Sequence, residues 1–449
     1  MSARKPPRLL AIAAPLFAEL GIGIAIGWVG TLLAARLSDA HGAAFALANQ
    51  VASMLFILFR IVGAGVGVVV AQALGGDRRS AADAVARATL GASSWVGGVT
   101  ALLAVAGAAP LLALLDAPAT VLPLAAPLLR ALAPAMMFDA WNAAMASVMR
   151  AHLRVRDTLA VIVAMQLVHL ALALALMPRL GLPGYALALA ASRAFGLALH
   201  LVLWRARLEL VPRWPDWWRL PRAELASVLR IGAPGAAENI AYRLSFMVSV
   251  AVAARLGARA LATQAYTLQL NALVLLAGLA SGLAMEIVVG HLVGAGRLHQ
   301  AHRLVRRALA WGLAVSVLGT AAVALAGPWL LARFTQDGRI VAAGVTLLWW
   351  TVLLEPGRTF NLVVINALRA AGDARFPVAA GAASMLVVLA GGSWLLGERL
   401  GLGLAGVWIA YAADEWLRGL IMWRRWAGLG WVPHARAAHR RLHREAAVR

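Results

Sequence analysis

Residues 9–37 read LLAIAAPLFAELGIGIAIGWVGTLLAARL, a long apolar run in which Glu19 and Arg36 are the charged side chains. An α-helix rises 1.5 Å per residue, so about 20 apolar residues cross a hydrocarbon core ~30 Å thick. The run is too long for the apolar core of a signal peptide, and no clear small-residue cleavage site follows it. It therefore predicts a retained transmembrane helix.

The same character extends over the whole chain. Of its 449 residues, 62% are hydrophobic and 13% are charged, and the mean hydropathy is +0.80. A soluble protein has ~25% charged residues. This composition excludes a cytosolic enzyme, a DNA-binding domain and a disordered scaffold. The chain has no cysteine, which excludes disulfides, thiolate metal sites and cysteine nucleophiles.

Apolar runs between charged or Pro/Gly-rich breaks predict an all-α integral membrane protein with twelve transmembrane helices. The expected spans are 9–37, 44–74, 89–111, 121–148, 158–177, 184–203, 228–256, 261–293, 308–327, 341–367, 378–396 and 402–423.

The formal net charge of +22 is concentrated in arginines between these runs. Alternate connections differ in Lys and Arg content by roughly four to one, and positive loops stay in the cytoplasm. We therefore expect both termini in the cytoplasm of a multi-pass protein of the bacterial inner (plasma) membrane. Because membrane orientation accounts for the charge, no nucleic-acid partner is expected.

The chain is a tandem repeat. A shift of 219 residues without gaps places Pro15 on Pro234 and Glu19 on Glu238. The same shift matches further polar and Gly positions: Gln50 with Gln269, Gly75 with Gly294, Asn142 with Asn361, Arg150 with Arg369, and Arg156 with Arg375.

Each repeat holds six spans, an even number, so the two six-helix lobes enter the membrane from the same side. They are then related by a pseudo-two-fold axis along the membrane normal. We expect an N-terminal lobe at 1–203, a cytoplasmic linker at 204–225, a C-terminal lobe at 226–426 and a basic cytoplasmic tail at 427–449.

Two carboxylates lie near the middle of predicted spans. Glu19 and Glu238 each follow a proline by four residues, and proline frees a backbone carbonyl and can kink a helix. A charge at this depth costs ~2.5–3.5 kcal/mol even on a lenient scale, so it calls for an explanation. They are candidate proton or Na⁺ sites; the alternative is a protonated, hydrogen-bonded core carboxyl.

Other charges fall in the second half. Glu355 and Arg358 are three residues apart and can pair on one helix face. Asp139 occupies the repeat position of Arg358, which suggests a pair between the lobes. The spacing of Asp414, Glu415 and Arg418 predicts a structural ion-pair network.

The usual signals of a hydrolase are missing: the sequence has no Walker lysine, no His-Glu-x-x-His pair and no serine triad. We therefore expect no enzymatic activity and no cofactor, and an ion gradient as the energy source.

Several motifs resemble the multidrug and toxic compound extrusion (MATE) family. They are Ala48-Asn49-Gln50, the run 70–77 (VAQALGGD), its echo 289–297 (VGHLVGAGR), the run 367–373 (ALRAAGD), Glu355-Pro356-Gly357-Arg358 through Asn361, and the run 414–419 (DEWLRG). The resemblance covers essentially the whole chain.

This resemblance implies export of bulky, often cationic organic compounds in exchange for H⁺ or Na⁺. It places coupling on acidic residues of spans 1, 7 and 10. Many members carry an aspartate where this chain has Gly30, and a glutamate near Tyr242 and Arg243. Coupling should then fall on Glu19, Glu238 and Glu355, with Na⁺ at Glu19 or Glu238 as one form of it. The remaining candidates for the ion-coupling and substrate cavity are Asp139, Arg358, Asn142, Asn361, Asn49 and Gln50.

Two other functions remain open. An arginine-lined cavity would suit a flippase for a lipid-linked intermediate, with Arg60, Arg193, Arg243 and Arg358 as its cations. A non-transporting membrane sensor is disfavoured, since no soluble domain is attached. For the transporter we expect small organic substrates, membrane lipids as partners and a monomeric state, with the tail from Pro433 in contact with anionic lipid.

Overall fold

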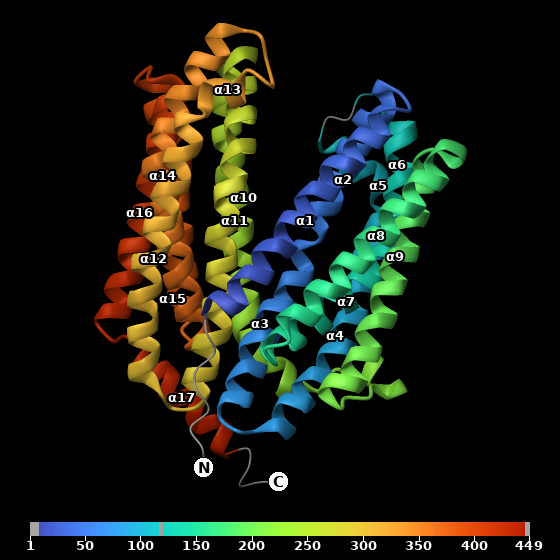
Figure 1. The fold of residues 1–449 in the computed structure, drawn as a ribbon, viewed down its shortest axis with the longest axis vertical. Coiled ribbons are helices and arrows are strands. Elements are labelled where there is room, and N and C mark those ends of the chain that lie inside the picture. The colour runs from blue at the N-terminus through green and yellow to red at the C-terminus, as the bar shows by residue number, and fades with distance from the viewer. Residues whose placement is uncertain (1–8, 116–117, 119, 445–449) are drawn as a thin grey trace. The chain divides into compact units, whose positions relative to one another are not determined.

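The computed structural model describes residues 9–115, 118 and 120–444, which form helices and turns and, within these ranges, no β-strand (Figure 1). The first half contains α1 (Leu9–Ala35), α2 (Asp39–Leu55), α3 (Ile57–Gly75), α4 (Arg79–Ala106), α5 (Ala108–Ala113), α6 (Leu122–Ala131), α7 (Ala133–Ala151), α8 (Val155–Leu180), α9 (Leu182–Leu203), η1 (Trp204–Leu208) and η2 (Trp214–Trp217). The second half contains α10 (Arg222–Arg255), α11 (Ala258–Gly294), α12 (Leu298–Leu325), α13 (Gly327–Leu331), α14 (Gly338–Ala370), α15 (Arg375–Ser384), η3 (Met385–Gly391), η4 (Ser393–Arg399), α16 (Gly403–Ala427) and α17 (Val432–Arg444).

Membrane-crossing helices dominate the described chain. Eight helices are long and apolar enough to cross a bilayer, and a ninth span results if α6 and α7 form one bent helix. The other three predicted spans fall on α2 with α3, on α10 and on α16. Helices α10 and α16 have 34 and 25 residues, so they are long enough, but several charged residues lower their hydropathy. The predicted all-α membrane fold is confirmed.

Two predicted spans are broken helices. The span 44–74 divides at Phe56 into α2 and α3, and the span 121–148 bends by 44° between α6 and α7. Pro134 lies in the first turn of α7. Proline lacks the N–H that would continue the hydrogen-bond ladder, and its ring clashes with the preceding turn. The bend follows from that residue.

The repeat recurs in the backbone as well as in the sequence. Left-handed φ angles occur at Asp77 (58°) and Gly296 (70°), and again at Leu153 (62°) and Gly372 (89°). Both pairs are separated by the 219-residue shift. The turns that end α3 and α11, and α7 and α14, therefore have the same handedness in the two halves.

The described chain divides into two compact units. The N-terminal unit holds Ala18–Leu74 and Arg78–Ala236, and the C-terminal unit holds the residues up to Phe17, Gly75–Asp77 and the chain from Ala237. In the N-terminal unit α7 packs against α4 and α9, and in the C-terminal unit α14 packs against α11, α12 and α16. α7 and α14 each carry residues of the site described below.

The segment predicted as a linker packs on the N-terminal unit. The ring of Trp217 lies edge-on to that of Trp141 with centroids 5.2 Å apart, and Trp95 Nε1 donates to the carbonyl oxygen of Trp218 at 3.1 Å. Helix α10 then begins at Arg222, six residues before the predicted span. This segment is held by specific contacts to α4 and α7.

Candidate functional site

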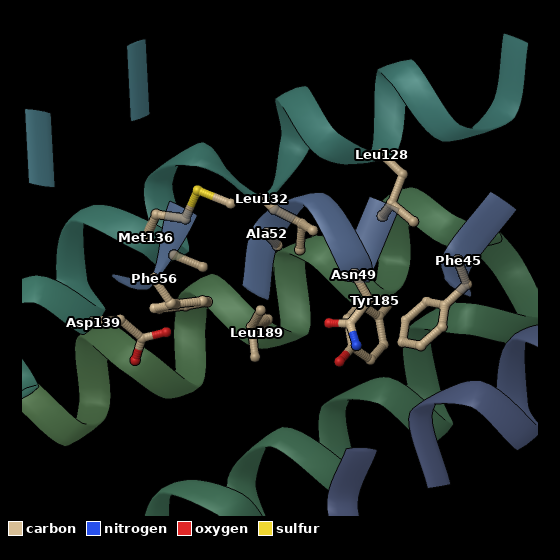
Figure 2. A pocket seen from close by; sticks show the side chains of 11 residues that line it. Phe45, Asn49, Ala52, Phe56, Leu128, Leu132, Met136, Asp139, Tyr185 and Leu189 are labelled. Carbon is tan, nitrogen blue, oxygen red and sulfur yellow. The ribbon is translucent and has the colours of Figure 1, made fainter. Parts of the chain in front are cut away.

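The N-terminal unit contains a cavity between α2, α6, α7 and α9 (Figure 2). Its walls are mainly apolar, and its polar atoms come from Asn49, Asp139 and Tyr185. Tyr185 lies edge-on to Phe45, with ring centroids 4.8 Å apart, which fixes one end of the cavity. Two predicted site residues, Asn49 and Asp139, thus line one space.

The cavity is small. Its volume of about 30 Å³ has room for about one water molecule and none for a bulky organic compound. A substrate would need a different arrangement of the helices around it.

Asp139 has a partner within its own unit. Its Oδ1 lies 2.9 Å from Nε of Arg193, which comes from α9. Asn142, one turn further along α7, donates to the backbone oxygen of Arg193 at 2.9 Å, and its own oxygen accepts from Nδ1 of His200 at 2.9 Å. These contacts fix α7 against α9, so Asn142 has a positioning role in the structure.

One ion pair occurs in both repeats. Arg150 at the end of α7 donates to Glu19 of α1, and Arg369 at the end of α14 donates to Glu238 of α10. All four side chains are largely buried, with 22% the largest exposed fraction. Two of the three predicted coupling carboxylates, Glu19 and Glu238, are thus neutralised by arginines from repeat-equivalent positions.

The C-terminal unit holds a larger buried network between α14 and α16. Arg358 Nη1 donates to Glu355 at 2.5 Å, and Arg358 Nε donates to Glu415 at 3.0 Å. Arg418 donates to Asp414 at 2.6 Å and lies 3.0 Å from Glu415. The predicted contact of Glu355 with Arg358 and the predicted network of Asp414, Glu415 and Arg418 are parts of one cluster.

The three carboxylates of this network differ in the hydrogen bonds that they accept from neutral groups. Asn361 donates to Glu415 at 3.0 Å, and Ser384 donates to Asp414 at 2.7 Å. Glu355, whose residue is 1% exposed, receives its hydrogen bond from Arg358. The cluster therefore holds three carboxylates against two guanidinium groups, and Glu355 is the carboxylate with the fewest donors.

The remaining predicted residues lie elsewhere. Gln50 is exposed on α2, and Arg243 is exposed on α10. The side chain of Arg60 lies outside the described part of the chain. Asp139 and Arg358 each have a partner inside their own unit, so the hypothesis that the two pair with each other stays a prediction.

Three arginines of the site were not predicted as partners of its carboxylates: Arg150 and Arg369, and Arg193, which entered only as a cation of the flippase alternative. A signal for two of them existed, because Arg150 and Arg369 match under the same shift as Glu19 and Glu238. Two charged positions that recur together in both halves are candidates for a pair. No comparable pattern in the sequence indicates that Arg193 contacts Asp139.

Among the described residues no group of three His, Asp or Glu side chains is arranged to hold a metal ion. The carboxylates of the ion pairs and of the network described above instead face guanidinium groups.

Comparisons with known proteins agree with this architecture. The MatE family model matches residues 15–175 and again 234–394, two segments that reproduce the 219-residue repeat. An uncharacterized transporter of Bacillus subtilis, YisQ, is 30% identical over 430 residues, covering 94% of each chain. The probable multidrug resistance protein NorM of Deinococcus radiodurans is 29% identical over 439 residues, covering 92% of this chain and 93% of that one. The solved structure of the Vibrio cholerae MATE transporter VcmN in its bent form has a similar fold, with a TM-score of 0.86 at 18% identity over 96% of this chain and 97% of that one.

The duplicated all-α fold, with a buried ion pair in each half, is that of a multi-pass membrane protein. The chain belongs to the MatE family, that of the multidrug and toxic compound extrusion transporters, and is therefore a membrane transporter and not an enzyme. The resemblance seen in the sequence motifs is thereby confirmed.

Proposed function

We propose that the chain is a secondary active antiporter that exports amphipathic, drug-like organic compounds, expected to be cationic, in exchange for H⁺ or Na⁺. Membership of the MatE family supports cation-coupled export, and the names of several relatives, such as the probable multidrug resistance protein NorM, support an organic substrate. The proposal includes a monomer in the bacterial plasma membrane, with both termini in the cytoplasm and lipids as neighbours.

The observation that carries the coupling site is the charge imbalance around Glu355. Glu19, Glu238 and Asp139 each face one arginine, so each pair is already neutral. Within the described part of the chain, the arginines that pair with Glu355, Glu415 and Asp414 are Arg358 and Arg418. One negative charge is left over, and a single H⁺ or Na⁺ would neutralise it.

A surplus charge at membrane depth is costly, so neutralisation changes which arrangement of the helices is favoured. A cation bound at Glu355 would weaken its attraction to Arg358, which also bonds to Glu415 on α16. The link between α14 and α16 would then loosen or re-form with each transport cycle. Substrate binding in the opposite state completes alternating access.

The test uses Glu355→Gln in the full chain, reconstituted in liposomes with a fluorescent organic cation as substrate. An outward H⁺ gradient, with the liposome interior more acidic, and an outward Na⁺ gradient are imposed in separate experiments, which distinguishes the two ions. We expect transport by Glu355→Gln to fall to the level of protein-free liposomes under either gradient. The control is Glu398→Gln, which removes a half-buried carboxylate paired with Arg255.

Two measurements complete this design. Thermal unfolding of purified Glu355→Gln must show a folded protein, since the amide keeps one acceptor for Arg358. Gradient-driven transport by that folded variant at the wild-type rate would remove Glu355 from the coupling site.

A flippase for a lipid-linked intermediate is less well supported. It needs arginines free to bind pyrophosphate, whereas Arg193 faces Asp139 and Arg358 faces Glu355 and Glu415. Carboxylates at those positions would repel the anionic headgroup. The arrangement therefore favours an exporter of organic compounds.

A further inference from the structure

The basic end of the chain forms a helix, α17, which is fixed to the C-terminal unit. Trp431 stacks on Trp426 with ring centroids 4.2 Å apart and donates from Nε1 to the Trp426 carbonyl oxygen at 3.0 Å. Further along, His439 donates from Nδ1 to the carbonyl oxygen of Gly294, the last residue of α11, at 2.8 Å. α17 is therefore anchored just before its first residue and again near its middle.

The helix has two different faces. Ala435, Ala438 and Leu442 recur at helical spacing and are buried. Arg436 and Arg440, four residues apart on another face, are exposed. Burial of the apolar stripe leaves the two guanidinium groups directed away from the protein core.

A cavity of about 430 Å³ lies between α17 and the start of α12. One wall is formed by Gly296, Leu298 and His299, and the other by Ala435, Arg436, His439 and Arg440. Pockets for small molecules have volumes of ~300–1,000 Å³. This cavity is large enough for a phosphate group with part of the molecule that carries it.

The cavity lies at a membrane surface. Helices α11 and α12 both have the length and hydropathy of membrane spans, so the turn between Gly294 and Leu298 lies where they leave the bilayer. α17 packs against α11 at that level, as Figure 1 shows for the lower end of the C-terminal unit. A ligand held there has access to lipid headgroups.

The charge of the lining has one sign. Four of its seven residues are arginine or histidine, and none is acidic. The carboxylate of Asp373 forms an ion pair with Arg425, whose Nε lies 2.8 Å from Oδ2 of Asp373.

We propose that this cavity binds the phosphate of an anionic phospholipid headgroup, with Arg436 and Arg440 as its principal ligands. The lipid would tie α17 to the bilayer surface and hold the turn between α11 and α12. This inference is independent of the transported substrate and of the coupling ion.

The test measures lipid binding by the purified full chain in detergent, with native mass spectrometry and thermal unfolding. The probes are phosphatidylglycerol, phosphatidylcholine and inorganic phosphate. The variant is Arg436→Gln/Arg440→Gln, and the matched control is Arg306→Gln/Arg307→Gln, which removes two exposed arginines of α12 outside the cavity lining.

We expect phosphatidylglycerol to bind the wild type and the control and to raise their unfolding temperatures. Affinity in the cavity variant should fall by roughly 30-fold, the effect of losing two basic residues near an anionic surface. An equal loss of phosphatidylglycerol affinity in the control would show that the effect comes from general surface charge, and it would overturn the proposed site. An equal thermal shift from inorganic phosphate or phosphatidylcholine would overturn the assignment to an anionic lipid.

Discussion

Glu238 and Arg369 pair at a depth where neither charge is stable alone. Moving a carboxylate into the bilayer centre costs ~2.5–3.5 kcal/mol or more, and an opposite charge offsets that cost. The same two residue types pair 219 positions earlier, as Glu19 and Arg150. Because the pair is present in both halves, we interpret it as an anchor between the first and fourth spans of each repeat.

Arg369→Met should therefore destabilise the protein by ~3–5 kcal/mol, because it leaves the Glu238 carboxylate buried without a partner. The double variant Glu238→Gln/Arg369→Met should recover most of that loss. Chemical denaturation in detergent gives the free energies of unfolding for both variants and for Glu238→Gln. Simple additivity of the two single changes would contradict an energetically coupled pair.

At the scale of elements, close backbone approach decides how α3 packs on α10 within the N-terminal unit. A β-carbon on Gly65 would lie 2.1 Å from the carbonyl oxygen of Val228, and one on Gly232 would lie 1.7 Å from that of Ile61. Gly63, two residues after Ile61, has no neighbour within 4 Å of such an atom. The small-residue run that begins at Gly63 is thus a packing surface, as glycine runs in membrane helices generally are.

These neighbours provide a matched pair of substitutions. Gly65→Ala should lower stability by ~1–3 kcal/mol, since the added methyl group forces the two helices apart. Gly63→Ala should be neutral or slightly stabilising, because alanine has the higher helix propensity and meets no obstacle. The measurement compares the unfolding temperatures of the two variants with that of the wild type. Equal effects at both positions would refute the packing argument.

At the scale of the whole molecule, the alternation of positive charge predicts orientation. Ser80 lies in the first turn of α4, next to the arginine-rich connection that follows α3, and Gln336 lies between α13 and α14, on the predicted opposite side of the membrane. Both side chains are exposed. The absence of cysteine from the sequence makes each position testable by a single substitution.

A membrane-impermeant maleimide should label Gln336→Cys in intact cells and Ser80→Cys only in inverted vesicles. The reason is that arginine-rich connections remain in the cytoplasm during insertion. Transport assays on both variants verify that the fold is retained. Labelling of Ser80→Cys from outside the cell would reverse the proposed topology.

Much of the fold could be predicted because its causes are local. A run such as 9–37 crosses a bilayer by length and hydropathy, and a tandem shift that aligns Pro15 with Pro234 shows duplication without any coordinates. The arrangement of the site was harder to predict from the sequence. Asp139 has a candidate partner wherever an arginine lies at similar depth, and the sequence offered several; the choice of Arg193 depends on how α7 packs on α9.

The sequence by itself determined that this protein lies in a lipid bilayer, that it is all-helical and that it is a twofold repeat. These properties follow from composition and periodicity, which can be read residue by residue along the chain. Only the tertiary structure decided which charges neutralise one another. Pairing depends on which helix faces meet, and those contacts join residues as far apart as Glu238 and Arg369. For the same reason the surplus carboxylate at Glu355 and the basic cavity beneath α12 became visible only once α14, α16 and α17 were in place.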